Sequence, residues 1–264
     1  MGGEAMEVLA PGGDKVAYRV FGDGPRTLIL VHGWMMSGAV FDPFLSALDT
    51  AGLRVVVPDL VGSGDSARPE SGYTLARYAD DVLAVLREVM SEGAPPAIVL
   101  GHSMGGQVAM LVAASARASV AQLVLLNPVP SCGVDLPEEA RGLFRSCAGD
   151  AEKLGMILDM ATEELSGPDR ARLLAIAVDV EEACIIEAFD AWTAGGFEDR
   201  LAEISASTLV LATDDAFLPR AFLESEVVDR ISGARLHYLA GPGHYPIVER
   251  AAETAAIVSD FLVT

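Results

Sequence analysis

A glycine-rich turn between an apolar run and a helix-forming segment is the sequence feature that most constrains this fold. The apolar run covers residues 97–100, the turn reads Gly101-His102-Ser103-Met104-Gly105-Gly106, and helix-favouring residues 107–114 follow. Glycines on both sides of Ser103 permit a tight, strained turn, because side chains there would collide where the helix passes the strand. The pattern predicts a buried strand that turns sharply into a helix, with one serine at the apex.

The position of Ser103 is typical of a nucleophile elbow, in which the hydroxyl lies at the N-terminus of a helix. Free backbone N–H groups and the positive end of the helix dipole stabilise negative charge there. A Gly-x-Ser-x-Gly pentapeptide also arises by chance in a chain with 26 glycines. The strand and helix patterns on either side favour the catalytic interpretation.

Short apolar runs alternate with helix patterns along most of the chain. The runs are continuous, as in strands that are covered on both faces. Repeated strand–helix units predict an α/β protein with a doubly wound, mostly parallel sheet. Residues 7–9 and 15–21 predict an antiparallel hairpin at the sheet edge. The predicted parallel strands are 27–31, 54–57, 97–100, 122–126, 208–211 and 235–239.

The alternation stops between Pro130 and Ser207, where helix signals replace strand runs. Residues 136–139 and 167–169 are typical of helix starts, and Gly195-Gly196 of a helix end. We therefore expect a core domain of residues 1–129 and 208–264. A helical cap of three to five helices, residues 130–207, is predicted to be inserted between two core strands.

A serine nucleophile needs a base, and the base needs a carboxylate that orients it. The chain has four histidines. His102 lies beside the serine, His32 lies in a His-Gly-Trp turn, and His237 lies in the middle of a predicted strand. His244 remains, in a glycine-rich loop between the last strand and the last helix, and we predict that it is the base.

The orienting carboxylate is expected just after the penultimate strand. Asp215 is our prediction, and Asp214 is the alternative. The oxyanion hole needs two backbone N–H groups. Met104, which follows the serine, and Trp34, in the turn after strand 27–31, are predicted to supply them.

These motifs together resemble the α/β-hydrolase superfamily over nearly the whole chain. The Ser, Asp, His order along the chain is also that of the superfamily. Within it, the pattern is similar to small carboxylesterases, including the carrier-protein methyl ester esterase of biotin synthesis, and to cofactor-free haloperoxidases (perhydrolases). The matching pieces are His32-Gly33-Trp34, residues 58–66, residues 101–106, Asp215 with Pro219, and Gly243-His244.

The resemblance implies acyl transfer, because Ser103 stands where the dehalogenases and epoxide hydrolases of this fold use aspartate. It implies a serine hydrolase that cleaves a small to medium, mostly apolar carboxylic ester or lactone through an acyl-enzyme. Carbon–carbon bond hydrolysis, perhydrolysis or a lyase reaction on the same triad is the alternative. A non-catalytic ligand receptor of the same fold is the alternative from another class. Residues 59–66 look like a structural turn, and Ser207 replaces a proline that is common in the family.

A substrate pocket is expected between the carboxyl ends of the strands and the cap. Most of its candidate residues are equally compatible with the core of the cap. An acidic cap also disfavours a strongly anionic substrate or an acidic acyl carrier. The candidates are Met35, Met36, Met156, Met160, Phe189, Trp192 and Phe197.

Composition limits the partners and the compartment. A formal net charge of −20 makes nucleic acid and anionic membrane surfaces poor partners. The three cysteines lack metal-type spacing, so we expect free thiols, no metal and no cofactor. No apolar run is long enough for a membrane span, and the first residues lack the pattern of a secretory leader. These features predict a cytoplasmic protein that acts on a small molecule, and no motif indicates an oligomeric state.

Overall fold

The computed structural model describes residues 3–263, and its centre is one sheet. The eight strands of this described region lie in the order β1-β2-β4-β3-β5-β6-β7-β8. The β1–β2 and β2–β4 pairs are antiparallel, and all other neighbours are parallel. The predicted α/β class and the edge hairpin are therefore confirmed. The strands are β1 (Glu4–Leu9), β2 (Lys15–Phe21), β3 (Arg26–Val31), β4 (Leu53–Pro58), β5 (Ala97–His102), β6 (Val120–Leu126), β7 (Ser207–Ala212) and β8 (Arg235–Tyr238).

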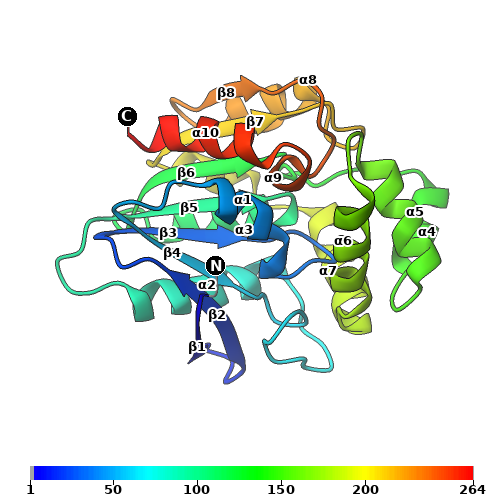
Figure 1. Ribbon diagram of the computed structural model, residues 1–264, viewed down its shortest axis with the longest axis horizontal. Coiled ribbons are helices and arrows are strands. Elements are labelled where there is room, and N and C mark those ends of the chain that lie inside the picture. Colours follow the sequence, from blue (N-terminus) through cyan, green and yellow to red (C-terminus); the bar gives the residue numbers. More distant parts are fainter. Residues whose placement is uncertain (1–2, 264) are drawn as a thin grey trace.

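Helices cover both faces of the sheet (Figure 1). The helix α1 (Asp42–Ala47) packs against α10 (Ala251–Leu262), and α2 (Leu75–Val89) packs against α3 (Met104–Ser115). Two covered faces explain why the central strands are apolar without alternation. In β3, for example, residues 28–31 have no exposed surface.

All secondary-structure elements between β6 and β7 are helices. Within this segment, all of whose residues are described, four α-helices and one 3-10 helix follow one another. Figure 1 shows the four α-helices as a layer at the carboxyl ends of the strands, to the right of the sheet, whereas the 3-10 helix packs against α3 (Met104–Ser115). We call residues 130–207 the cap and retain these limits as our proposal. Its helices are α4 (Glu138–Arg145), α5 (Ala151–Ala161), α6 (Gly167–Val178), α7 (Glu182–Ala194) and η2 (Glu198–Glu203).

Side chains at the helix starts explain several of the cap boundaries. The Asp150 carboxylate accepts hydrogen bonds from two N–H groups of the first turn of α5. The Ser166 hydroxyl accepts one from the N–H of Asp169 at the start of α6. These side chains satisfy donors that a helix leaves free at its first turn.

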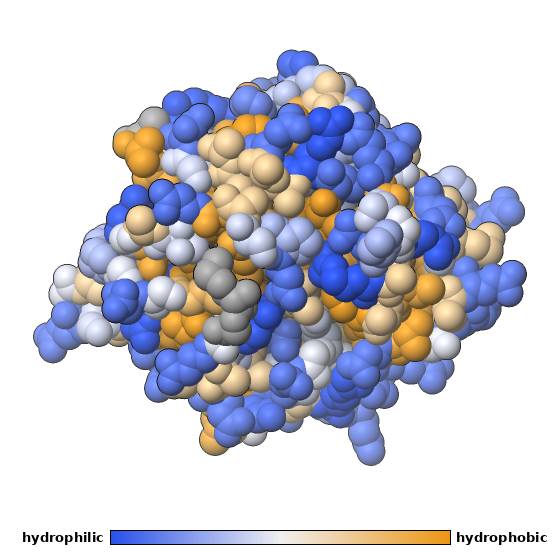
Figure 2. Space-filling view, in the orientation of Figure 1, coloured by the Kyte–Doolittle hydropathy of each residue, from blue (hydrophilic) through white to orange (hydrophobic). Residues whose placement is uncertain are grey.

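Hydrophilic residues cover much of the face shown in Figure 2, with smaller apolar patches between them. Across residues 3–263, every helix is too short or too polar to cross a lipid bilayer. Cys132, Cys147 and Cys184 are free thiols. Met1 and Gly2, on which the leader prediction partly depends, lie outside the described residues.

Candidate active site

Ser103 stands alone between β5 and α3, in a backbone conformation that few side chains adopt. Its φ is 57° and its ψ is −125°. A Cβ atom on Gly101 would lie 2.2 Å from the Gly105 carbonyl oxygen, and one on Gly105 would lie 2.2 Å from the Val31 carbonyl oxygen. Only glycine fits where strand and helix approach so closely, and the strain at Ser103 lifts its side chain out of the sheet.

Asp215 and His244 come from different loops and form a direct hydrogen bond. The His244 Nδ1 atom lies 2.5 Å from Asp215 Oδ2. The other carboxylate oxygen accepts the N–H groups of Phe217 at 2.8 Å and Leu218 at 3.3 Å. Burial acts to raise the pKa of Asp215, but the His244 imidazole and these hydrogen bonds outweigh it and lower the pKa below its ordinary value. The carboxylate is therefore ionised and oriented toward the histidine.

The alternative carboxylate, Asp214, is placed differently. It is exposed, and it accepts hydrogen bonds from the Gly241 N–H at 2.8 Å and from the Tyr238 hydroxyl. It therefore ties together the loops at the edge of the sheet. Of the two aspartates, Asp215 is the one that contacts His244.

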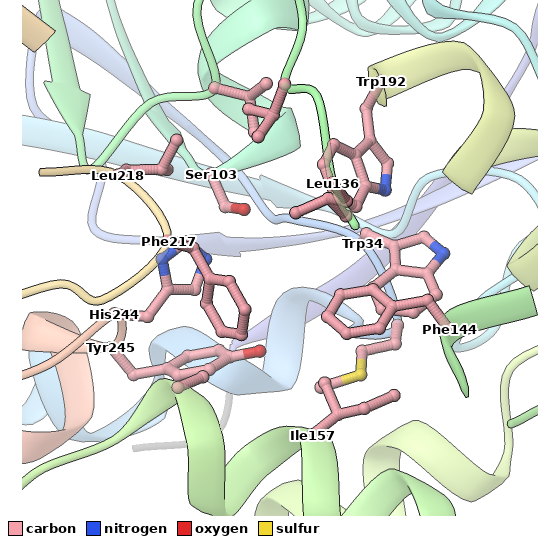
Figure 3. A pocket seen from close by; sticks show the side chains of 14 residues that line it. Trp34, Ser103, Leu136, Phe144, Ile157, Trp192, Phe217, Leu218, His244 and Tyr245 are labelled. Carbon is pink, nitrogen blue, oxygen red and sulfur yellow. The ribbon is translucent and has the colours of Figure 1, made fainter. Parts of the chain in front are cut away.

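Ser103 and His244 line one cavity at the carboxyl ends of the strands (Figure 3). Within residues 3–263, no direct hydrogen bond joins the serine hydroxyl to the imidazole. Such contacts are often long in a free enzyme and tighten when substrate binds. The two side chains therefore face the same space.

The backbone of His244 is held on both sides. Its N–H donates to the Ala161 carbonyl at 2.7 Å, at the end of α5 in the cap. Its carbonyl accepts from His102 Nε2 at 2.7 Å and from Asn127 Nδ2 at 3.3 Å. Burial, and then the neighbouring His244, lower the pKa of His102 to about 3, so this ring stays neutral. His102 thus positions the predicted base through its main chain.

The two backbone donors predicted for the oxyanion hole lie beside the serine. Met104 is the first residue of α3, where helix N–H groups have no partner within the helix. A Cβ on Gly33 would lie 2.9 Å from the Ser103 Cβ, so the turn that carries Trp34 lies against the nucleophile. Within the described chain, neither the Met104 nor the Trp34 amide donates to another protein group.

His32 fixes that turn rather than facing the cavity. Its Nε2 atom accepts the Leu60 N–H at 2.9 Å, so the proton is on Nδ1, which donates to the Gly33 carbonyl at 2.9 Å. Burial lowers the pKa of His32. The ring is therefore a neutral structural link between the Trp34 turn and the loop after β4.

Glu249, at the end of α9 (Pro246–Glu249), binds the histidine loop to the cap. Its Oε2 atom accepts the N–H groups of Glu163 at 2.8 Å, Glu164 at 2.8 Å and Gly243 at 3.1 Å. Its Oε1 atom accepts the Tyr245 N–H at 3.1 Å. One carboxylate thus satisfies four main-chain donors from two loops. Sequence reasoning did not identify this residue.

The cavity is narrow, and apolar side chains dominate its walls. Met35 and Trp192, two of the predicted candidates, line it. Figure 3 shows Trp34 and Phe144 across from His244 and Tyr245. The full lining is Trp34, Met35, Ser103, Val129, Val134, Leu136, Phe144, Ile157, Ala161, Trp192, Phe217, Leu218, His244 and Tyr245.

The other pocket candidates lie elsewhere, and the prediction for them is corrected. Met156 and Met160 are 49% and 46% exposed on α5, because Ile157 and Ala161, one position further along each, face the cavity instead. Phe189 is fully buried behind Trp34 and Trp192.

Met36 and Phe197 are likewise absent from the lining. Met36 is buried and borders a smaller cavity beneath the Trp34 turn. Phe197 precedes η2 and packs half-buried against the core. Composition identifies such apolar side chains as core or pocket material but cannot separate the two uses.

Comparisons with known proteins show the family of this chain. Residues 28–257 match the model of the alpha/beta hydrolase family, and the chain belongs to that family. A non-heme haloperoxidase from Rhodococcus erythropolis is 29% identical over 90% of this chain and 92% of its own. A pimeloyl-[acyl-carrier protein] methyl ester esterase from Aromatoleum aromaticum is 29% identical over 88% of this chain and 96% of its own.

A solved structure, an esterase from Exiguobacterium antarcticum, superimposes with a TM-score of 0.90 at 21% identity. The superposition covers 99% of this chain and all of that one. At this level of identity, the likeness shows the shared fold.

Proposed function

We propose that this protein is a serine hydrolase that cleaves carboxylic esters or lactones through an acyl-enzyme. The observation that carries the proposal is the His244–Asp215 hydrogen bond of 2.5 Å, made beside a strained serine that opens onto the same cavity. A nucleophile, a base and an orienting carboxylate are the groups that acyl transfer requires. An esterase and a haloperoxidase among the relatives are compatible with this chemistry.

The reaction follows from the positions of these groups. His244 Nε2 takes the proton of the Ser103 hydroxyl as its oxygen attacks the acyl carbon. The amides of Trp34 and Met104 stabilise the oxyanion, and Asp215 stabilises the imidazolium. His244 then protonates the departing alcohol oxygen, and afterwards activates the water that releases the acid.

The walls of the cavity favour an apolar substrate of modest size. Trp34, Phe144 and Phe217 surround the narrow space in front of the serine. Such walls exclude water and strengthen electrostatic interactions inside the site. A short acyl group is therefore the expected fit.

The test is covalent labelling combined with turnover. A fluorophosphonate is expected to label Ser103, and p-nitrophenyl acetate to be hydrolysed. Ser103→Ala should no longer be labelled, and its kcat should fall by at least about 10³-fold. Ser115→Ala, at the far end of the same helix, is the matched control and should keep both.

Esterase activity that survives Ser103→Ala would overturn the proposal. A panel of esters, lactones and vinylogous diketones, assayed with and without hydrogen peroxide, distinguishes ester hydrolysis from carbon–carbon cleavage and perhydrolysis. An unlabelled, inactive protein would favour a receptor.

A further inference from the structure

Tyr245 brings a third polar side chain to the cavity, next in the chain to the predicted base. Figure 3 shows its hydroxyl directed into the cavity, away from the main chain of the histidine loop. The indole N–H of Trp34 is already used, since it donates to the Ile185 carbonyl at 2.8 Å. The indole nitrogen of Trp192 is buried without a hydrogen-bond partner, and it points away from Ser103 in Figure 3. Among the described residues that line the cavity, the Tyr245 hydroxyl is therefore placed, with Ser103 and His244, to meet a polar part of a bound molecule.

The ring of Tyr245 is fixed in place. It packs edge-on against His244, with ring centroids 5.2 Å apart at 88°, and it packs tilted against His102, with ring centroids 5.1 Å apart at 47°. Its N–H donates to Glu249, and only 3% of the residue is exposed. A rigid ring holds the hydroxyl at a constant place relative to the base.

The Tyr245 hydroxyl has no hydrogen-bond partner among residues 3–263. Tyrosine hydroxyls in a protein interior usually have a partner, so a free hydroxyl on the cavity wall is available to a bound molecule. Burial, and then the charges of Asp215 and Glu249, raise the pKa of Tyr245 far above its ordinary value. The phenol is therefore neutral, and it acts as a hydrogen-bond donor rather than as a base.

We propose that Tyr245 is a specificity-determining residue whose hydroxyl donates a hydrogen bond to a second oxygen of the substrate. The preferred substrates are then esters or lactones that are otherwise apolar and carry a keto, ether or hydroxyl oxygen separate from the ester group. This inference rests on the proposed hydrolase function. It adds a polar requirement to a site whose other walls are apolar.

The experiment compares isosteric pairs of substrates on wild type and Tyr245→Phe. One pair varies the acyl part (p-nitrophenyl methoxyacetate and p-nitrophenyl butyrate). The other varies the alcohol part (2-methoxyethyl acetate and butyl acetate). The readout is the change in the kcat/KM ratio of each pair between wild type and variant, which cancels the intrinsic reactivity of the esters and any general loss from altered packing.

In at least one pair, the kcat/KM ratio of the methoxy substrate to its alkyl counterpart should fall about tenfold or more in Tyr245→Phe. A site that hydrogen-bonds a polar group discriminates strongly against a substrate that lacks it. Tyr18→Phe removes the same atom from a buried tyrosine outside the cavity lining and should leave both ratios unchanged. Unchanged ratios in Tyr245→Phe, with hydrolysis intact, would overturn the inference alone.

A binding measurement separates this inference from the proposed function. Methoxyacetate and butyrate are titrated into Ser103→Ala, with and without Tyr245→Phe. A preference for methoxyacetate that disappears with the hydroxyl supports the inference, whatever the reaction. Equal binding of the two acids to both proteins overturns it. If wild type shows no esterase activity and no label on Ser103, the hydrolase proposal is overturned instead.

Discussion

The core and the cap contribute to the site in different ways. The core supplies Ser103, Asp215 and His244, each fixed by strand ends and main-chain hydrogen bonds. The cap supplies apolar side chains such as Phe144, Ile157 and Trp192, which face the cavity without making polar contacts inside it. We therefore propose that the polar groups of the core carry out the reaction, and that the cap, together with core residues such as Tyr245, selects the substrate. Substitutions in the two regions should therefore change different kinetic constants.

The largest effect is expected at the core carboxylate. Asp215→Asn removes the charge that orients His244 and stabilises its imidazolium, so kcat should fall by about 10³-fold or more. The loss should be the same for every ester, whatever its acyl chain. Steady-state kinetics on acetate and hexanoate esters measures this. Asp214→Asn is the matched control, and an equal loss there would contradict the assignment of Asp215.

An intermediate effect is expected where the two regions meet. Glu249→Gln leaves part of a set of four main-chain donors unsatisfied, which should lower kcat about tenfold and the free energy of unfolding by about 1–3 kcal/mol. Urea unfolding and steady-state kinetics measure the two quantities. Glu253→Gln, a nearby exposed glutamate paired with Arg250, is the control. Normal kinetics in Glu249→Gln would show that the cap does not hold the histidine loop.

The smallest effect is expected inside the cap. Phe144 stacks flat on Trp34, with ring centroids 5.3 Å apart at an interplanar angle of 1°. Phe144→Leu enlarges the cavity and should shift the kcat/KM ratio of hexanoate to acetate esters about tenfold toward hexanoate. Met156→Leu, on the exposed side of α5, should leave that ratio unchanged. If kcat/KM falls equally for both esters in Phe144→Leu, the proposal that the cap selects the substrate is wrong.

The parts of the site that the sequence predicted share a local cause. Adjacent residues predict the strand-to-helix turn at Ser103, because a strained backbone and a close helix require glycine at fixed spacing. His244 is the predicted base because the chain has only four histidines. Asp215 followed from its place after a strand, although its neighbour Asp214 shares that place. Only the fold showed which carboxylate reaches the imidazole.

The pocket was predicted poorly for an equally physical reason. Met156 and Met160 are as apolar as Ile157, but the rotation of α5 turns them outward. The rotation of a helix about its own axis depends on the elements it packs against, and its own residues do not specify those elements. Leu136, Phe144 and Phe217 reach the cavity from three separate segments, and the sequence carries no signal that they converge.

The sequence by itself determined the order of strands and helices, the strained serine and the short set of candidate partners. These depend on residues close together in the chain, where steric and hydrogen-bonding rules act directly. Tertiary structure alone decided that His102 and Glu249 position the histidine loop, that Phe189 is core, and that Tyr245 directs a free hydroxyl into an apolar cavity. Such roles depend on burial and on partners far away in the chain, and these exist only once the chain has folded.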